Sequence, residues 1–265
     1  MILALDVGNT NIVLGCMTNE EVYFTARLST NRCKTSHEYA VLIRDICGLR
    51  NINLEKVEGG IISSVVPELS EVLRDAVEMI IGTPPLIVGS SAKADLTVCM
   101  DHPNQLGSDL AVDAIAAIAE YPKPILIFDM GTATTVSAID TNSCYQGGMI
   151  IPGVMLTLEA VASRTSQLPH VSLDKPKQLV GKNTVDCMKS GIVYGNAAMI
   201  DGIIDRMEEE FGQPLTVLAT GGVAKTIIPF CKKEIIYDDT LLLKGLRILY
   251  QQQKRTISPE SEVIL

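Results

Sequence analysis

The chain has 265 residues, of which 47% are hydrophobic, so it can bury one large core or two smaller ones. Its formal net charge of −9 argues against nucleic acid as a partner, because that binding rests on phosphate neutralisation by lysine and arginine. No apolar run reaches the roughly 18 residues that cross a bilayer, and no basic leader precedes the first strand. We therefore expect a cytoplasmic protein without a membrane partner.

The cysteines and histidines are scattered along the chain, and no two cysteines form a Cys-x-x-Cys pair. This spacing argues against a zinc site and against a disulfide framework. In a chain without a signal peptide we expect reduced thiols, each acting as a small buried hydrophobe. The cysteines are Cys16, Cys33, Cys47, Cys99, Cys144, Cys187 and Cys231.

The first part of the chain predicts a meander of antiparallel strands followed by alternating helices and strands. The expected strands cover residues 2–5, 12–16, 22–28, 59–67 and 84–89. The expected helices cover residues 37–47, 69–81 and 108–120. The last of these is rich in alanine, and Pro122 and Pro124 end it.

The same order begins again at residue 125, which predicts a second unit similar to the first. The expected strands cover residues 125–128, 135–139, 145–151 and 215–220. The expected helices cover residues 154–164, 184–211 and 241–252, and residues 254–265 are typical of a frayed tail. The sequence therefore predicts two α/β domains in tandem, covering residues 1–118 and 119–265.

Two short turns carry the strongest chemical signal. Asp6–Asn11 reads DVGNTN and Asp129–Thr134 reads DMGTAT, and each follows an apolar strand. The glycine lets the backbone approach an anion, and neighbouring N–H, hydroxyl and amide groups bind phosphate oxygens. The aspartate repels phosphate directly, so it is expected to serve a metal ion or its water shell. A hairpin turn explains one copy, whereas two copies indicate a polyphosphate site.

A third turn, Thr220–Gly222, follows the apolar strand LTVLA and suits a base and ribose that lie against bare backbone. A simple tight turn is the alternative for this motif alone. The sequence contains neither a Gly-x-x-x-x-Gly-Lys-[Ser/Thr] loop nor a Gly-x-Gly-x-x-Gly motif after a strand, which excludes P-loop and Rossmann sites.

These three turns resemble the two phosphate motifs and the adenosine motif of the actin-like ATPase superfamily. Within it, the chain resembles the type III pantothenate kinases, a family also described as Bvg accessory factors. Further matches follow in family order: ISSVVP at 62–67, GSD at 107–109, GGMIIPG at 147–153, SRTSQLP at 163–169 and GKNT at 181–184.

The resemblance implies an α/β fold of two duplicated ribonuclease H-like domains, with mixed sheets flanked by helices and an ATP cleft between them. It also implies ATP-dependent phosphorylation of pantothenate to 4'-phosphopantothenate, the first step of coenzyme A biosynthesis. The implied cofactors are Mg²⁺ and a monovalent cation, K⁺ or NH₄⁺, and the implied assembly is a homodimer.

The resemblance also assigns residues. Asp6 would face Mg²⁺ through water, Asp129 would hold the monovalent cation, and Asp109 would be the catalytic base. The ATP-binding residues would be Asp6, Val7, Gly8, Asn9, Thr10, Asn11, Thr132, Gly221 and Gly222. The substrate-binding residues would be Met100, Gly107, Ser108, Asp109, Leu110 and Thr184. From the residues alone, Ser108 or Asp109 also suits a helix N-terminus, and Thr184 suits an N-cap.

The chain departs from the family pattern in the acceptor pocket. The family motif reads Gly-x-Asp-Arg, whereas this chain has Leu110 in the arginine position, and Met100 stands where the family often has tyrosine. Losing one charge-assisted contact to the pantothenate carboxylate costs about 1.5–3 kcal/mol. Weakened pantothenate binding, a different small acceptor, and a non-catalytic nucleotide-binding paralogue with a regulatory role are therefore three open alternatives.

Overall fold

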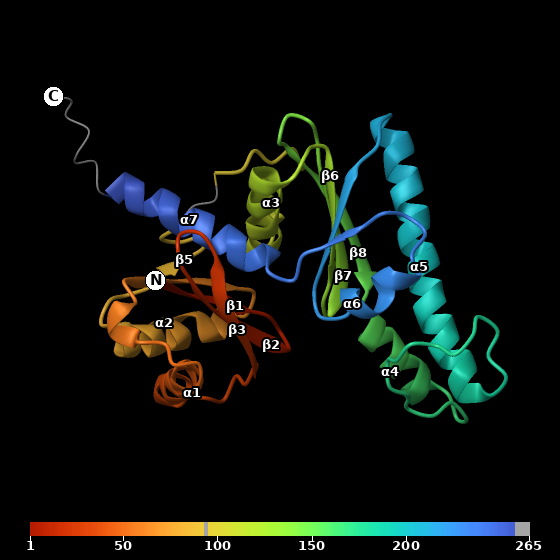
Figure 1. Cartoon of the computed structure of the whole chain (residues 1–265), viewed down its shortest axis with the longest axis horizontal. Helices are drawn as coiled ribbons and strands as arrows, with labels where there is room; N and C mark the ends of the chain where they lie inside the picture. The colour runs from red at the N-terminus through yellow and green to blue at the C-terminus, as the bar shows by residue number, and fades with distance from the viewer. Residues whose placement is uncertain (93–94, 258–265) are drawn as a thin grey trace. The chain divides into compact units, whose positions relative to one another are not determined.

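The computed structural model describes residues 1–92 and 95–257, and their contacts divide the chain into two compact units (Figure 1). The first unit contains Met1–Leu96, Asn104–Ala117 and the described segment Thr240–Ile257, and the second contains Thr97–Pro103 and Ile118–Asp239. The domain boundary between residues 118 and 119, which the sequence predicts, stays a prediction. The contacts add that the closing segment packs with the first unit.

The first unit is built on a mixed five-stranded sheet with the order β3-β2-β1-β4-β5. The strands β1, β2 and β3 are antiparallel neighbours, as the predicted meander requires, and β1, β4 and β5 run parallel. The strands are β1 (Ile2–Val7), β2 (Asn11–Met17), β3 (Val22–Ser29), β4 (Gly59–Ser64) and β5 (Leu86–Ile87). The helices of this unit are α1 (Ser36–Leu49), α2 (Pro67–Ile81), α3 (Ser108–Glu120) and α7 (Leu241–Ile257).

Side chains of β1 alternate between two cores, one on each face of this sheet. Leu3, Leu5 and Val7 pack with α1 and α2 in one core. Ile2 and Ala4 pack with α3 and α7 in the other. The next residue of this second set is Asp6, so alternation places the Asp6 side chain on the α3 face.

The second unit repeats this architecture with the sheet order β10-β9-β6-β7-β8. Its central strand again pairs antiparallel with the following strand and parallel with a later one. The strands are β6 (Ile125–Met130), β7 (Ala133–Ile139), β8 (Tyr145–Pro152), β9 (Thr216–Thr220) and β10 (Ile236–Tyr237). The helices are α4 (Val154–Arg164), α5 (Thr184–Phe211) and α6 (Ala224–Ile227). The predicted duplicated α/β fold with two mixed sheets is confirmed.

Several predicted boundaries were wrong. The strand expected over 84–89 covers only Leu86–Ile87. The strand expected over 59–67 ends at Ser64, because Pro67 is the first residue of α2, where its fixed φ suits a helix start. The last helix continues to Ile257, so the first four residues of the predicted tail are helical. The rest of that tail, 258–265, lies outside the described residues. Three short 3₁₀ turns, Leu54–Lys56, Pro103–Gln105 and Ile228–Phe230, were not predicted.

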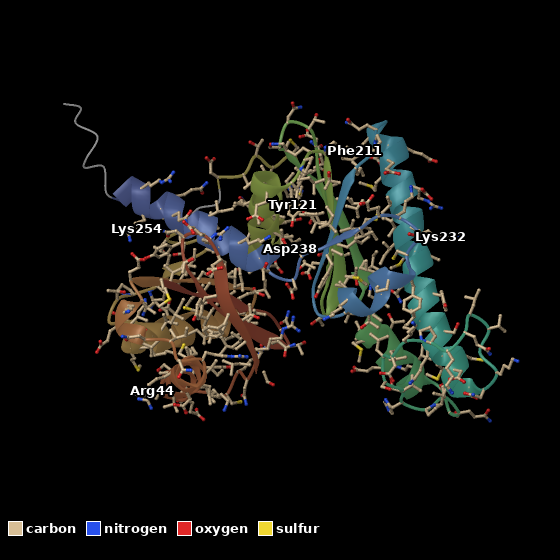
Figure 2. The ribbon with its side chains drawn as sticks, viewed as in Figure 1. Arg44, Tyr121, Phe211, Lys232, Asp238 and Lys254 are labelled. Carbon is tan, nitrogen blue, oxygen red and sulfur yellow. A yellow bond between two sulfur atoms is a disulfide. The ribbon has the colours of Figure 1, made fainter. Side chains whose placement is uncertain are left out.

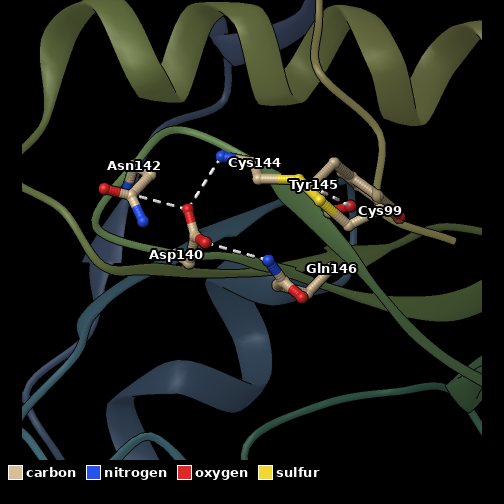
Figure 3. Close-up of a disulfide and its surroundings, with 6 residues drawn as sticks. All are labelled: Cys99, Asp140, Asn142, Cys144, Tyr145 and Gln146. Carbon is tan, nitrogen blue, oxygen red and sulfur yellow. Dashed lines mark hydrogen bonds between the residues drawn. A yellow bond between two sulfur atoms is a disulfide. The ribbon is translucent and has the colours of Figure 1, made fainter.

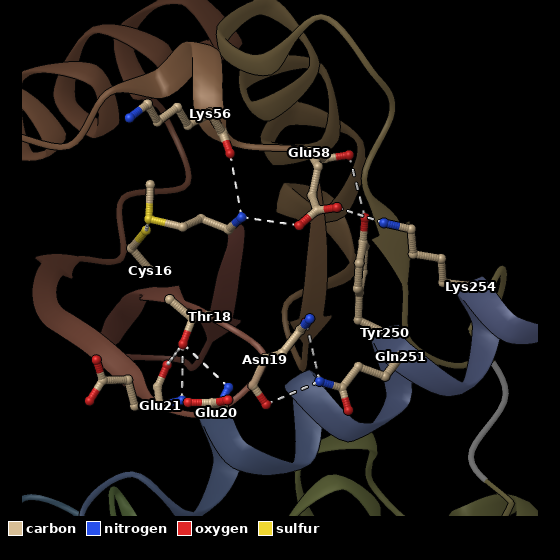
Figure 4. A network of polar contacts seen from close by, with 11 residues as sticks. Cys16, Thr18, Asn19, Glu20, Glu21, Lys56, Glu58, Tyr250, Gln251 and Lys254 are labelled. Atoms are coloured by element: carbon tan, nitrogen blue, oxygen red, sulfur yellow. Dashed lines mark hydrogen bonds and ion pairs between the residues drawn. The ribbon is translucent and has the colours of Figure 1, made fainter.

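Polar contacts around Glu58 hold α7 against the first sheet (Figure 4). Lys254 Nζ lies 2.6 Å from Glu58 Oε2, and the N-terminal amine lies 3.1 Å from Glu58 Oε1. These cations lower the pKa of Glu58, the bond from Lys254 most strongly. The Tyr250 hydroxyl also donates to the Glu58 carbonyl oxygen at 3.4 Å. Helix α7 is thereby tied to Glu58, which also binds the N-terminal amine.

One hydrogen bond in the second unit joins the segment before β6 to the segment after β10. The Tyr121 hydroxyl donates to Asp238 Oδ2 at 2.7 Å, and Figure 2 shows the two side chains facing each other. The Asp238 backbone N–H donates to the Ala219 carbonyl oxygen at 2.9 Å. The segments before β6 and after β10 are therefore held together close to β9.

The prediction that all seven cysteines are buried thiols was wrong for several of them. Cys16 and Cys47 are buried, and burial raises the pKa of the Cys47 thiol to about 11, which makes it a poor nucleophile. Cys33 and Cys187 are exposed instead.

Cys99 and Cys144 form a disulfide in the second unit (Figure 3). The two residues are 45 positions apart, and a parallel bridge between Val98 and Tyr145 brings them together. Cys144 lies in the turn between β7 and β8, where Asp140 Oδ1 accepts its backbone N–H at 2.8 Å. The expectation of reduced thiols was wrong for these two cysteines, because their pairing depends on a tertiary contact between segments distant in sequence.

We expect loss of this disulfide to lower the free energy of unfolding by about 2–4 kcal/mol, because it closes a long loop in the unfolded chain. Denaturant unfolding of Cys99→Ser, with and without dithiothreitol, measures the effect. Cys33→Ser, an exposed free thiol, is the control and should change stability by less than about 0.5 kcal/mol. An unchanged midpoint in both Cys99→Ser and the reduced wild type would contradict the prediction.

Candidate active site

Each unit places one carboxylate at the end of its central strand. Asp6 is the penultimate residue of β1, and Asp129 is the penultimate residue of β6. On β6, Leu126, Phe128 and Met130 pack against α5 and α6, so alternation turns Asp129 to the opposite face. The expected equivalence of Asp6 and Asp129 is thus consistent with their identical positions in two sheets of the same topology.

A hydroxyl from the parallel neighbouring strand stands beside each carboxylate. Asp6 is in register with Ser63 on β4, and Asp129 is in register with Thr220 on β9. Adjacent strands lie roughly 4.8 Å apart, and both hydroxyl residues are buried. Ser63 was not predicted as a site residue. Its signal in the sequence is a hydroxyl residue at the end of a buried apolar strand, which Thr220 repeats in the second unit.

Hydrogen bonds to backbone carbonyl groups close the first turn, and the side chains at its tip are exposed to solvent. The Gly8 N–H donates to the Asn11 carbonyl oxygen at 3.0 Å, and the Thr30 hydroxyl donates to the Gly8 carbonyl oxygen at 2.6 Å. Asn9, Thr10 and Asn11 are exposed. The turn therefore exposes amide and hydroxyl groups beyond the end of β1.

The second turn is one residue shorter than the first. Between Met130 and its partner Thr134 the chain has three residues, whereas four residues separate Val7 from Ile12. The Gly131 N–H donates to the Ala133 carbonyl oxygen at 3.1 Å. The two turns therefore occupy equivalent positions but present different side chains, with Thr132 at the tip of the second.

Gly221 brings the third predicted motif against the second turn. Its φ is +90°, and a Cβ atom there would lie 2.7 Å from the Met130 carbonyl oxygen and 2.8 Å from Asp129 Oδ1. Only glycine fits this conformation and this approach. Beyond Gly222, a cavity of about 430 Å³ opens beside α6. It is lined by Leu173, Asp174, Lys175, Lys225, Thr226, Pro229 and Phe230.

The start of α3 lies close to the Asp6 end of the first sheet. Ser63 Oγ donates to Ser108 Oγ at 3.2 Å, and Ser108 Oγ donates to the Ser64 carbonyl oxygen at 3.5 Å. Asp109 is half-buried in the first helical turn, and its Oδ1 accepts the Leu110 N–H at 2.9 Å. A Cβ at Gly107 would lie 2.6 Å from Asp109 Oδ1, so glycine makes room for this carboxylate.

The other predicted acceptor residues lie in the second unit. A Cβ at Gly147 on β8 would lie 3.8 Å from Met100 Cγ, so Met100 lies beside that strand. Thr184 is exposed and is the first residue of α5. The alternative in which Thr184 caps this helix was wrong, because Asn183 is the N-cap and its side chain accepts the Asp186 N–H at 2.9 Å.

The donor groups suit cations that arrive with phosphate. Among residues 1–92 and 95–257, no three His, Cys, Asp or Glu side chains gather into a metal cluster. Mg²⁺ commonly binds one or two carboxylates and takes its remaining ligands from water and substrate phosphates. Asp6 beside Ser63, and Asp129 beside Thr220, fit such incomplete oxygen sites. None of the helices in the described segments is long and apolar enough to span a bilayer.

We expect Gly221→Ala to weaken ATP binding by at least about 10-fold, because the new methyl group pushes the turn away from β6. Gly212→Ala is the matched control: its φ is +65°, but a Cβ there meets nothing within 4 Å. That control should lose about 1 kcal/mol of stability and keep its affinity for ATP. Calorimetric titration with ATP measures both, and equal affinities in the two variants would refute the argument.

Comparisons with known proteins identify the family. The sequence profile described as "Type III pantothenate kinase" matches residues 2–206. The chain is 41% identical over 255 residues to a type III pantothenate kinase from an Exiguobacterium species. The aligned region covers 96% of this chain and 100% of the relative. It is 39% identical to one from Moorella thermoacetica, over 95% of this chain and 99% of the relative.

A solved structure supports the fold independently of sequence. The activator of the 2-hydroxyisocaproyl-CoA dehydratase from Clostridium difficile, with bound ADPNP, is only 13% identical. The match nevertheless covers 100% of this chain and 99% of the activator's chain, with a TM-score of 0.59. The fold is that of the actin-like ATPases, and the chain belongs to the type III pantothenate kinase family.

Proposed function

We propose that the protein transfers the γ-phosphoryl group of ATP to pantothenate and forms 4'-phosphopantothenate, the first step of coenzyme A biosynthesis. The observation that carries this proposal is the full-length match to a type III pantothenate kinase at 41% identity. The two strand-end turns support it, because each combines exposed polar groups with a buried strand that fixes the turn.

On the donor side, the turn residues Gly8–Asn11 bind phosphate oxygens through backbone N–H, amide and hydroxyl groups. Thr132 contacts the phosphates from the second turn. Gly221 and Gly222 hold the nucleoside, and the neighbouring cavity has room for a base and ribose. Mg²⁺ and a monovalent cation, when bound, neutralise charge on the phosphates. The Asp6 carboxylate would hold Mg²⁺ through water, and the Asp129 carboxylate would hold K⁺ or NH₄⁺.

On the acceptor side, Asp109 is the general base. The pantothenate hydroxyl oxygen forms a bond to the γ-phosphorus while the bond to the β,γ-bridging oxygen breaks, and the hydroxyl proton passes to the Asp109 carboxylate. Gly107, Ser108 and Leu110 position the acceptor around that carboxylate. Met100 and Thr184, which belong to the second unit, are the remaining proposed substrate-binding residues.

Leu110 favours a second candidate, a kinase of this family whose small acceptor lacks a carboxylate. An apolar side chain cannot form the charge-assisted contact that arginine makes with pantothenate. Pantothenate remains the first choice because the rest of the acceptor motif, Gly107–Asp109, is intact.

A homodimer is part of the proposal. Large apolar side chains are exposed on β8 and α4 of the second unit, among them Ile150 at 81% and Leu156 at 51% exposure. Met149, Met155 and Val161 are exposed on the same two elements. Apolar surface of this kind is typical of a protein interface. Action in the cytoplasm, without nucleic acid or membrane as a partner, stays a prediction from composition.

We expect Asp109→Asn to lower turnover at least about 100-fold, because the amide cannot accept the proton, while ATP affinity changes less than about 3-fold. Coupled measurement of ADP release with pantothenate, and separate ATP titration, test this. Asp45→Asn, an exposed carboxylate on α1, is the control and should leave both unchanged. Turnover of Asp109→Asn within about 10-fold of the wild type would sink the base assignment.

We expect Leu110→Arg to lower the KM for pantothenate about 10-fold or more and to leave the KM for ATP unchanged, because it restores a charge-assisted contact. Leu110→Gln, similar in polarity but without charge, is the matched control and should give less than a third of this effect. Steady-state kinetics with each substrate varied measures both constants. Equal KM values for pantothenate in wild type and Leu110→Arg would show that position 110 does not face the acceptor.

A further inference from the structure

The segment that follows β3 is attached to the first phosphate turn by three hydrogen bonds. The Thr30 hydroxyl donates to the Gly8 carbonyl oxygen at 2.6 Å, and the Thr30 N–H donates to the Thr10 carbonyl oxygen at 3.0 Å. Arg32 Nη2 then donates to Asn9 Oδ1 at 3.2 Å. A guanidinium group is therefore held at the tip of a turn that itself contains no lysine or arginine.

Buried contacts behind this segment fix the backbone that carries Arg32. The hydroxyl of Tyr39, a fully buried side chain of α1, donates to the Asn31 carbonyl oxygen at 2.9 Å. The same hydroxyl accepts the Asn31 N–H at 3.0 Å, and Asn31 Oδ1 accepts the Cys33 N–H at 2.9 Å. Residues on both sides of Arg32 are thus anchored, so its position is set by the fold rather than by a free loop.

The positive charge of Arg32 is not neutralised by an acid of the described chain. No carboxylate oxygen within residues 1–92 and 95–257 forms an ion pair with it, although the protein has a net charge of −9. Arg44 and Arg74 of the same unit both pair with neighbouring acids. The bond to Asn9 uses one N–H of the Arg32 guanidinium and leaves the others for a ligand.

We propose that Arg32 is a further catalytic residue, which contacts the terminal phosphoryl group of bound ATP and stabilises the charge that develops on it during transfer. This role rests on the proposed kinase function. Arginine suits it because its planar fork binds phosphate oxygens with two parallel hydrogen bonds. Arg32 takes no proton and forms no covalent bond. The γ-phosphoryl group passes from ATP to the acceptor oxygen, ADP leaves, and Asp109 takes the hydroxyl proton.

Arg32→Gln, Arg32→Lys and the control Arg44→Gln test the role. Arg32→Gln keeps a donor for Asn9 but removes the charge, and we expect its kcat to fall about 100- to 1,000-fold. Arg32→Lys restores the charge without the fork and should recover part of that loss. Arg44→Gln removes an exposed, acid-paired arginine of α1 and should leave kcat unchanged.

A second readout needs no acceptor. Titration with ATP and with ADP, each with Mg²⁺, gives the ratio of the two affinities. We expect Arg32→Gln to weaken ATP about 10- to 100-fold and ADP less than about 3-fold, because only ATP carries the terminal phosphate. A merely structural role would weaken both nucleotides together.

The outcomes separate this inference from the proposed function. Wild-type turnover of pantothenate, combined with an unchanged kcat and ATP preference in Arg32→Gln, would overturn the Arg32 role and leave the function intact. An equal loss of ATP and ADP affinity would also overturn it. If the wild type does not phosphorylate pantothenate, the selective loss of ATP affinity in Arg32→Gln still supports the phosphate contact, and its absence refutes it.

Discussion

The alternation of side chains along β1 and β6 is the constraint on which the site depends. In each strand the inward residues of one face fill a helical core, and this fixes which way the aspartate near the strand end must point. A shift of either strand by one residue would bury Asp6 or Asp129 in that core and move the apolar side chains of the core to the opposite face of the sheet. The apolar cores thus fix the face of each sheet on which the carboxylate lies.

The same constraint explains why the neighbouring residues are small or polar. Ser63 and Thr220 share the face of the carboxylate beside them, where a larger apolar side chain would displace any cation or water. Gly221 lies against Asp129 and Met130 and has no room for a side chain. Gly107 likewise leaves space for the Asp109 carboxylate. Small residues therefore collect where the backbone comes close to the proposed phosphate site, as close approach of the backbone to an anion requires.

Much of this arrangement could be predicted from the sequence because it is local. Apolar strands that end in Asp-x-Gly, and an Ala-rich helix closed by Pro122 and Pro124, are signals contained within short windows. The proposed role of Arg32 and the place of Ser63 beside Asp6 were not predicted, because both depend on contacts between segments distant in sequence. The Cys99–Cys144 pair and the return of α7 to the first sheet were missed for the same reason. The N-cap of α5 was misplaced by one residue, since Asn183 and Thr184 are both good caps by composition.

The sequence departs from its family pattern on the proposed acceptor side of the site, whereas the motifs of the proposed donor side are intact. The donor residues lie on strand ends, in glycine turns and beside an anchored arginine, whereas the acceptor motif Gly107–Leu110 lacks the arginine of its family. The measurement that tests the central claim most directly is mass spectrometry of the product formed by the purified protein from ATP, Mg²⁺, K⁺ and millimolar pantothenate. The account predicts 4'-phosphopantothenate in amounts matching the ADP released. Tight ATP binding without any phosphorylated pantothenate would contradict it.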